Sequence, residues 1–172
     1  NENDPPAHDF FGTCCLKWEN AADLMEEAGL RTVKLRIGVV LAKEGGALPQ
    51  LAAPVKWFVG SPLGSGKQWM PWIHIDDLCA IFLKAIEDQN MNGVFNAVAS
   101  HHVTNKEFVK LIGKTLGRPV FFPPVPKFAL KLFLGEMSGI VTEGSRASNE
   151  KVLKAGFVFE YNELLPALRN LL

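Results

Sequence analysis

Two apolar segments, each set between helical patterns, constrain the fold of this chain more than any other feature. Residues 32–41 are rich in β-branched side chains and almost continuously apolar from Leu35 onward, and residues 93–99 form a second such run. Continuous apolar runs are typical of strands that a parallel sheet buries on both faces. Strands that alternate with helices indicate an α/β protein with a parallel sheet. A doubly wound domain has about five or six strands and only two long ones are evident, so we expect an incomplete sheet.

Helical periodicity and end signals predict the remaining elements. Thr104 and Glu107 form a capping box, and Gly117 ends the helix that the box begins. Asp76 is expected to cap an earlier helix, because its carboxylate can accept the free amide hydrogens of the first turn. Residues 60–67 are expected to form an irregular loop and residues 72–75 a brief strand. The predicted helices cover residues 10–28, 47–59 (interrupted by Pro54), 76–87, 104–116, 128–134, 148–154 and 162–172.

The charges of the chain are balanced, with 18 basic and 18 acidic residues. Surfaces built for nucleic acid or for an anionic membrane usually have an excess of one sign, so neither partner is expected. No apolar stretch approaches the roughly 20 residues that span a bilayer, and no signal peptide is evident. Cys14, Cys15 and Cys79 lack the spacing of a disulfide framework or a metal site. We expect no metal, and we expect these cysteines to be reduced core thiols of a cytoplasmic protein.

The first residues, Asn-Glu-Asn-Asp-Pro-Pro, contain neither a Met nor a strand pattern. We therefore expect the chain to continue a longer protein whose N-terminal half, with its glycine-rich phosphate loop, is missing. The loop at residues 60–67 (Gly-Ser-Pro-Leu-Gly-Ser-Gly-Lys) is similar to a phosphate cradle in composition. It lacks the strand–loop–helix context and the spacing of such a loop, so it does not replace the missing one.

Three motifs follow one another along the chain. Residues 35–40 read Leu-Arg-Ile-Gly-Val-Val, residues 72–78 read Trp-Ile-His-Ile-Asp-Asp-Leu, and residues 93–119 hold Gly-Val-Phe-Asn, Val-Thr, Glu-Phe and Leu-Gly-Arg-Pro in that order. The ordered set resembles the second half of the extended short-chain dehydrogenases/reductases. Further matches indicate the subgroup of NAD-dependent, nucleotide-sugar epimerase-like epimerases/dehydratases with a C-terminal domain of unknown function. They lie at residues 18–19, 64–69, 128–130, 134–137, 143–144 and 155–161.

The resemblance implies NAD or NADP as cofactor and a tyrosine–lysine pair, four residues apart on one helix, that handles the proton during hydride transfer. In the register set by Glu19, Phe11 stands at the tyrosine position and Cys15 at the lysine position. Phe has no ionisable proton and Cys no permanent positive charge, so the usual pair is absent. Three alternatives follow. Lys17 acts from a shifted position together with a tyrosine upstream, or Cys15 acts as a nucleophile. In the third, the protein binds dinucleotide with altered or no redox chemistry.

Ile37, Gly38 and Val39 are the candidate cofactor contacts, because the resemblance places them on the strand beneath the nicotinamide. A glycine after a strand residue lets the backbone approach a flat ring; a bulge or strand end is the alternative. Arg36 needs a partner if it is buried, either a structural carboxylate or a ligand.

The candidate substrate contacts lie in and after the glycine-rich loop and in the C-terminal part. Lys67 and Gln68 are expected to face a ligand from a flexible loop, or to belong to an exposed connector. Trp69 and Trp72 wall a pocket or cap the core. Arg146 is the candidate for binding an anionic group, with a surface salt bridge as the alternative.

Two positions near the second motif qualify the resemblance. Enzymes that act on nucleotide sugars carry a diphosphate-binding arginine where this chain has Met70, which argues against a nucleotide-sugar substrate. His74, at the end of a predicted strand, is expected to have a structural role.

Taken together, residues 1–118 are predicted to be the C-terminal part of a Rossmann-like, doubly wound NAD(P)-binding domain with substrate-side insertions, and residues 119–172 a small helical C-terminal lobe. The expected function is an NAD(P)-dependent epimerase/dehydratase-like oxidoreductase with a small-molecule substrate bound between the sheet and the lobe. The alternative is a non-catalytic dinucleotide sensor or partner-binding protein. The expected protein partners are the missing N-terminal half and a second copy in a homodimer.

Overall fold

The computed structural model describes residues 1–135 and 138–172, so Glu136 and Met137 of the motif at 134–137 lie outside the described residues. Strands and helices alternate in the first two thirds of the chain, and helices follow, which confirms the α/β class. The short helix α6 was not expected from the sequence. The elements are α1 (Phe10–Glu27), β1 (Val33–Ile37), β2 (Val39–Leu41), α2 (Ala47–Lys56), β3 (Trp72–His74), α3 (Ile75–Glu87), β4 (Gly93–Ala97), α4 (Asn105–Leu116), α5 (Lys127–Leu134), α6 (Ser138–Thr142), α7 (Glu150–Lys154) and α8 (Leu164–Leu171).

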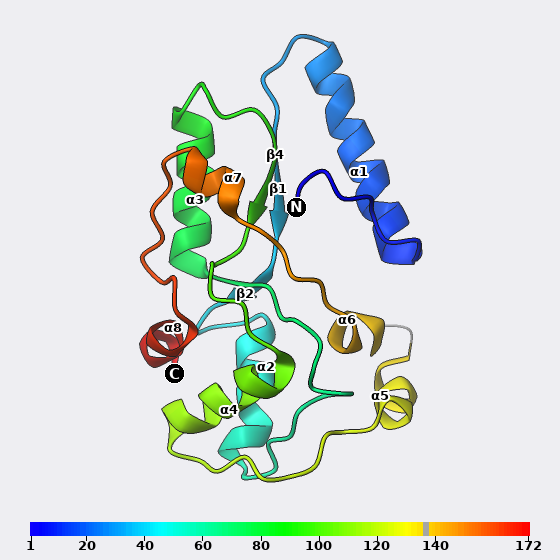
Figure 1. Ribbon diagram of the computed structural model, residues 1–172, viewed down its shortest axis with the longest axis vertical. Helices are drawn as coiled ribbons and strands as arrows, with labels where there is room; N and C mark the ends of the chain where they lie inside the picture. Colours follow the sequence, from blue (N-terminus) through cyan, green and yellow to red (C-terminus); the bar gives the residue numbers. More distant parts are fainter. Residues whose placement is uncertain (136–137) are drawn as a thin grey trace.

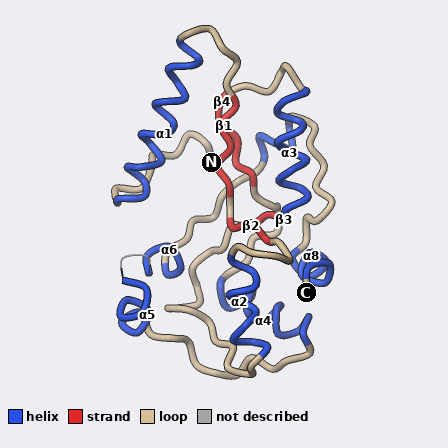
Figure 2. The backbone as a smooth tube through the Cα atoms, turned by 180° about the vertical axis from the view of Figure 1, so that it is seen from behind, coloured by secondary structure: helices blue, strands red, loops and turns tan. Residues whose placement is uncertain are grey.

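The described strands form two parallel pairs. β1 lies beside β4, in register from Val33 opposite Gly93 to the strand ends, and β2 lies beside β3. The single strand predicted over residues 32–41 is therefore divided at Gly38, where the chain leaves one pair and enters the other. Helices α1 and α3 cover opposite sides of the β1–β4 pair (Figures 1 and 2). This is a partial Rossmann-like layer arrangement, as expected.

Buried apolar side chains form two clusters. The upper cluster joins β4, α3 and α7, with Phe95, Ile81 and Val152 among its members. The lower cluster joins α2, α4 and α8, with Leu48, Phe108 and Leu168 fully buried. Residues on both sides of position 118 contribute to each cluster, so α7 and α8 pack directly against the strand-bearing part. The division into domains at residue 118 stays a prediction.

Helix α1 is attached to the strands through polar contacts rather than apolar ones. Asp9 caps its first turn by accepting the Gly12 amide at 2.7 Å, and ion pairs connect Asp23 to Lys34 and Glu19 to Arg36 on β1. No residue of α1 is buried among the described residues. The prediction of core thiols was wrong for Cys15 and for Cys79 of α3, which are exposed, while Cys14 is half-buried. The described elements leave the apolar side of α1 uncovered.

Helix α4 begins and ends as the sequence predicts. Thr104 is its N-cap, the capping box with Glu107 is complete, and Gly117 ends it in a left-handed conformation.

Strand β1 departs from expectation, because all five of its residues are half-buried or exposed rather than buried on both faces. An interior strand needs a neighbour on each edge, and the described residues give β1 only β4.

Candidate functional site

A small hollow of about 10 Å³, room for about one water molecule, lies at the carboxyl ends of β1 and β4. Three stretches line it: residues 69–71 before β3, residues 98–99 and 101–103 after β4, and residues 145–147 before α7. In open α/β sheets ligands bind outside the carboxyl ends of the strands. The hollow is therefore the candidate site, and it is formed by segments far apart in the sequence.

Trp69 and Arg146, two of the predicted substrate contacts, meet at this hollow. The Arg146 guanidinium carbon lies 5.7 Å from the centre of the Trp69 ring, within the range of a cation–π contact. The chain at Gly144 passes directly over Trp69: a Cβ at position 144 would lie 1.9 Å from the Trp69 carbonyl oxygen. Glycine at 144 thus allows the C-terminal part to bring Arg146 onto the indole.

His102 is a site residue that the sequence analysis missed. Its ring contacts Trp69 edge-to-face, with centroids 6.4 Å apart, and its Nε2 lies 2.8 Å from the Ala147 carbonyl oxygen. A carbonyl can only accept, so Nε2 carries the hydrogen and Nδ1 of the neutral ring is left as an acceptor. The signal in the sequence was a histidine in the loop after a strand, just before a capping box.

Gly38 lies directly behind the wall of the hollow. Its amide donates to Ala97 O at 3.2 Å, and the next amide, of Val39, donates to Pro71 O at 2.7 Å. A Cβ at position 38 would lie 2.8 Å from Pro71 O and 2.9 Å from Val98 Cγ1. The packing of the chain itself therefore requires glycine here, as in the strand-end alternative. Ile37 remains 45% exposed at the end of β1 and is not among the residues that line the hollow.

The glycine-rich loop before Trp69 is closed by its own hydrogen bonds. The amides of Gly64, Gly66 and Lys67 donate to oxygen atoms of the chain at 2.9, 3.0 and 3.1 Å. Gln68 Nε2 donates to the Leu63 carbonyl at 2.9 Å, so this side chain braces the loop, whereas Lys67 is exposed. A phosphate cradle needs backbone amides that point at the ligand, and these amides are already used.

Trp72 belongs to the core rather than to the rim of the hollow. It is 1% exposed, packs in the lower cluster and donates its indole N–H to the His101 carbonyl at 2.9 Å. Of the two alternatives stated for this residue, the buried position supports capping of the core.

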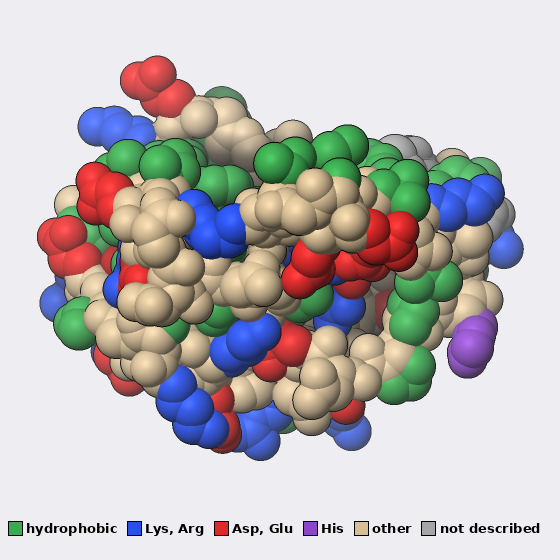
Figure 3. All heavy atoms as spheres, turned by 90° about the horizontal axis from the view of Figure 1, so that it is seen from above, with side chains coloured by type: hydrophobic (Ala, Val, Ile, Leu, Met, Phe, Trp, Pro, Cys, Tyr) green, Lys and Arg blue, Asp and Glu red, His purple; other side chains and the backbone are tan. Residues whose placement is uncertain are grey.

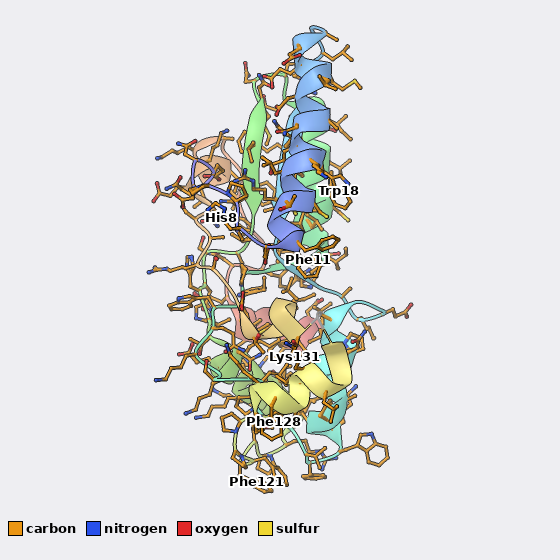
Figure 4. The ribbon with its side chains drawn as sticks, turned by 90° about the vertical axis from the view of Figure 1, so that its right-hand side faces the viewer. His8, Phe11, Trp18, Phe121, Phe128 and Lys131 are labelled. Atoms are coloured by element: carbon orange, nitrogen blue, oxygen red, sulfur yellow. The ribbon has the colours of Figure 1, made fainter. Side chains whose placement is uncertain are left out.

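The candidate catalytic residues of α1 do not line the hollow. Phe11 is 41% exposed, and Cys15 and Lys17 are exposed as well. Figure 4 shows Phe11 and Trp18 projecting from α1 on the side where no described element covers it. The position expected for a catalytic tyrosine is therefore held by an apolar ring in open space.

Arg36 has a structural carboxylate as its partner. Its Nε and Nη2 donate to Glu19 Oε1 and Oε2 at 2.6 and 2.7 Å, and Nη1 donates to the Glu2 carbonyl at 3.0 Å. This two-pronged bond lowers the pKa of Glu19 below its ordinary value of 4.5. The pair fixes α1 to β1, so the structure favours the structural carboxylate over a ligand as the partner of Arg36.

The His-x-Asp-Asp motif anchors the C-terminal part. His74 Nδ1 accepts the Asp76 amide at 3.1 Å, and Nε2 lies 3.2 Å from Asn170 Oδ1 on α8. Asp77 accepts the amides of Glu160 and Tyr161 at 2.8 and 3.0 Å. The prediction that Asp76 is the N-cap was wrong: His74 caps α3, because β3 runs straight into the helix and leaves His74 as the last extended residue.

Of the three predicted cofactor contacts, Ile37 is exposed, whereas Gly38 and Val39 are half-buried. Among the described residues, no set of three or more His, Cys, Asp or Glu side chains could hold a metal ion. Within the same part of the chain, no helix is both long and apolar enough to cross a bilayer.

The fold defines the class first: a partial Rossmann-like α/β domain with a small hollow at the carboxyl ends of its strands. Residues 21–97 match the NAD dependent epimerase/dehydratase family, and residues 125–171 match a domain of unknown function, DUF1731. The chain belongs to this epimerase/dehydratase family, in the group that carries the DUF1731 domain.

Similar proteins come from distant organisms. The chain is 39% identical over 172 residues to the epimerase family protein SDR39U1 homolog, chloroplastic, of Arabidopsis thaliana, covering all of this chain and 49% of that protein. It is 40% identical to epimerase family protein SDR39U1 of Mus musculus, covering 94% of this chain and 55% of the relative. The chain thus spans about half the length of the curated relatives that it matches.

Two solved structures share the fold. The crystal structure of human epimerase family protein SDR39U1 (isoform 2) with NADPH is 37% identical, with a TM-score of 0.92 over 99% of this chain and 58% of that one. The nucleoside-diphosphate sugar epimerase of Corynebacterium glutamicum is 29% identical, with a TM-score of 0.77 over 99% of this chain and 32% of that one.

Proposed function

We propose that the whole protein is an NADP(H)-dependent oxidoreductase of a small molecule, and that this chain supplies its nicotinamide side and its substrate side. The observation that carries the proposal is the meeting of Trp69 and Arg146 at the hollow beyond the carboxyl ends of β1 and β4, with Ile37 exposed at the end of β1. The human relative that was crystallised with NADPH supports the choice of cofactor.

Ile37, Arg146 and Trp69 would each contact a different part of the bound molecules. Ile37 offers an apolar face to the nicotinamide, which supplies the hydride donor or acceptor when bound. Arg146 attracts a negatively charged group of the substrate, and the Trp69 ring stacks on a flat or apolar part of it. Met70 lines the same hollow and accepts a hydrogen bond from the Asn105 amide through its sulfur at 3.2 Å. A diphosphate would need a cation there, so we propose an acidic small molecule rather than a nucleotide sugar.

Proton transfer needs a group other than the usual pair, because Phe11 and Cys15 cannot provide it. His102 is suited to this task. Its Nε2–H is held by Ala147 O, so Nδ1 is the ring atom left to exchange a proton with a bound substrate. Lys17 is the other candidate that the sequence offers, with a tyrosine outside this chain.

The second candidate function is a dinucleotide-binding protein without turnover. Phe11 in the tyrosine position favours it directly. A sensor of this kind would retain the hollow and the Ile37 surface but would need no acid or base.

Turnover by the full-length protein separates the two functions. The assay follows NADPH oxidation with a panel of carbonyl compounds, with and without a carboxylate, for the wild type and for His102→Gln, Arg146→Met and Lys17→Ala. The oxidoreductase proposal predicts turnover that His102→Gln lowers at least tenfold and that Arg146→Met weakens mainly for the acidic compounds. NADPH binding with no turnover, unchanged in Lys17→Ala, would establish the non-catalytic function instead.

The expected N-terminal half and second copy stay proposals as partners. Large apolar side chains on α1 remain exposed in the described structure, including Phe10 at 75% and Trp18 at 78%. Either partner would bury them. Chemical crosslinking of the full-length protein, with a Trp18→Ser variant as comparison, would distinguish an intermolecular contact from an intramolecular one.

A further inference from the structure

The balanced total charge conceals an uneven distribution. Residues 45–75 and 108–135 together carry seven of the 18 basic residues and none of the 18 acidic ones. These stretches contain α2, most of α4, α5 and the loops between them, which form the lower part of the molecule in Figure 1. The rest of the chain has an acidic excess. Basic charge is therefore in excess on these two stretches although the net charge of the chain is zero, and Glu107 on α4 and Glu143 after α6 border them.

Large apolar side chains project from the same lower part. Trp57 is 80% exposed, Phe121 67% and Phe128 77%. Figure 4 shows Phe121, Phe128 and the cationic Lys131 together at this end. Isolated exposed apolar residues are ordinary on protein surfaces, but a group of large aromatic ones marks an interaction site.

Direct contacts join the two stretches into one surface. The Arg118 guanidinium carbon lies 4.2 Å from the centre of the Phe58 ring. Ser61 Oγ donates to Pro123 O at 2.5 Å, and the Val125 amide donates to Pro62 O at 2.8 Å. The turn after α2 and the loop before α5 are thus held together. We call the surface formed by Trp57, Phe58, Arg118, the loop 119–124 and α5 the basic aromatic end.

The backbone at the tip of this surface is strained. Phe58 has a φ of 60° and is the single non-glycine residue with a positive φ among the described residues. A left-handed conformation costs a residue with a Cβ roughly 1–2 kcal/mol. The Phe58 amide donates to Val55 O at 3.0 Å and the Val59 amide to Pro54 O at 2.9 Å, so the positive φ of Phe58 belongs to a Schellman motif that ends α2.

Extension of the sheet would not cover the basic aromatic end. The unpaired edge of β1 and the uncovered side of α1 lie in the upper part of the molecule, above the level of α5 (Figure 1). A strand added beside β1 would lie there as well. The upper end, seen in Figure 3, also differs in charge, because acidic and basic side chains are mixed on it.

We propose that the basic aromatic end docks the protein on a bilayer surface with anionic headgroups. Aromatic and aliphatic side chains that project between lysines and arginines are suited to such an interface: the rings enter the boundary of the acyl region while the cations stay at the phosphates. Each basic residue near an anionic bilayer contributes about 1 kcal/mol. Nucleic acid would satisfy the cations but would leave Trp57 and Phe128 without an apolar environment.

Sedimentation of the full-length protein with lipid vesicles tests this surface. We expect binding to phosphatidylcholine vesicles that contain phosphatidylserine, little binding to phosphatidylcholine alone, and weaker binding at high salt. Lys127→Gln with Lys131→Gln should lower the affinity about thirtyfold, given the contribution per residue. Trp57→Ser with Phe128→Ser should lower it as well. All four side chains are exposed, so these variants should fold, which their thermal unfolding will verify.

Matched controls lie on other faces of the molecule. Ile86→Ser on α3, where the side chain is 66% exposed, and Lys154→Gln on α7 should leave vesicle binding unchanged. Equal binding to both kinds of vesicle, no binding to either, or equal losses in the controls would overturn the proposal. So would tight binding to single-stranded DNA that competes with vesicles and does not depend on Trp57 and Phe128, since it would indicate a soluble polyanion as the partner.

Discussion

Gly38 lies so close to the carbonyl oxygen of Pro71 that a Cβ on residue 38 would approach it to 2.8 Å. The contact joins the end of β1 to the segment that leads into β3, and both flank the candidate hollow. The glycine is thus explained by the protein's own packing, with or without a bound cofactor.

Replacement of Gly38 by Ala should destabilise the cofactor-free protein by about 1–3 kcal/mol, because the added methyl group overpacks a closed backbone contact. Urea unfolding measures the loss. Gly139→Ala is a suitable control, since an added Cβ there meets nothing within 4 Å. If Gly38 served the nicotinamide alone, the variant would unfold like the wild type and only its NADPH affinity would fall.

The ion pair between Glu19 and Arg36 should make stability depend on pH in the acid range. The pKa of Glu19 is lowered in the folded state by the Arg36 hydrogen bonds, so the stabilisation is present above the ordinary value of 4.5 and is lost as the pH falls through the lowered folded value. Glu19→Gln should cost about 1 kcal/mol at neutral pH, a modest figure because Arg36 is 36% exposed.

The measurement is chemical unfolding of wild type and Glu19→Gln from neutral to acid pH, together with Arg36→Gln and the double variant. The difference between wild type and Glu19→Gln should shrink below pH 4.5. A constant difference at every pH would contradict the assignment, because the loss would then come from packing alone.

Asp77 should contribute more to stability than its neighbour Asp76. Its carboxylate is buried and accepts two backbone amides of the segment that leads to α8. Asp77→Ala leaves both donors without a partner, at a cost of about 3 kcal/mol in all. Asp76 is exposed in the first turn of α3, so Asp76→Ala should cost less than about 1 kcal/mol. Similar losses from the two variants in thermal unfolding would show that Asp77 does not anchor the C-terminal part.

Thr104 should stabilise α4 as its N-cap through the hydroxyl group, and its methyl group should contribute little. Thr104→Ala removes the acceptor for the Glu107 amide and should cost about 1 kcal/mol, while Thr104→Ser should cost almost nothing. The Thr104 backbone amide and hydroxyl also lower the pKa of Glu107. Loss of the hydroxyl should therefore move the Glu107 titration upward, toward its ordinary value, as an NMR titration can show.

Residues 1–172 alone should bind NADPH weakly or not at all. The amides of Gly64, Gly66 and Lys67 already donate to oxygen atoms of the chain, that of Gly64 to Val125 O, so the glycine-rich loop gives the phosphates no cradle. Calorimetry with the isolated chain is the direct measurement. Micromolar affinity would mean that the cofactor surface is complete without any further segment.

The sequence by itself determined most of the helices and the family. Capping residues such as Thr104 and Gly117 act within a few residues of the chain, and hydrophobic periodicity depends on neighbours three or four positions away, so both can be read without a structure. The ordered motifs identified the family for the same reason: each is a contiguous stretch. The division of residues 32–41 at Gly38 was not predictable, because it depends on where residues 71 and 98 pass in space.

Only the tertiary structure decided which candidate residues act together. Trp69 and Arg146 meet, with His102 beside them, because Gly144 lets one segment cross another closely. Trp72, three positions from Trp69, lies instead in the core. Arg36 found its carboxylate on α1, and His74 took the capping role expected of Asp76. The contacts of Arg36 with Glu19 and of Trp69 with Arg146 join residues 17 and 77 positions apart, and such contacts cannot be read from local sequence patterns.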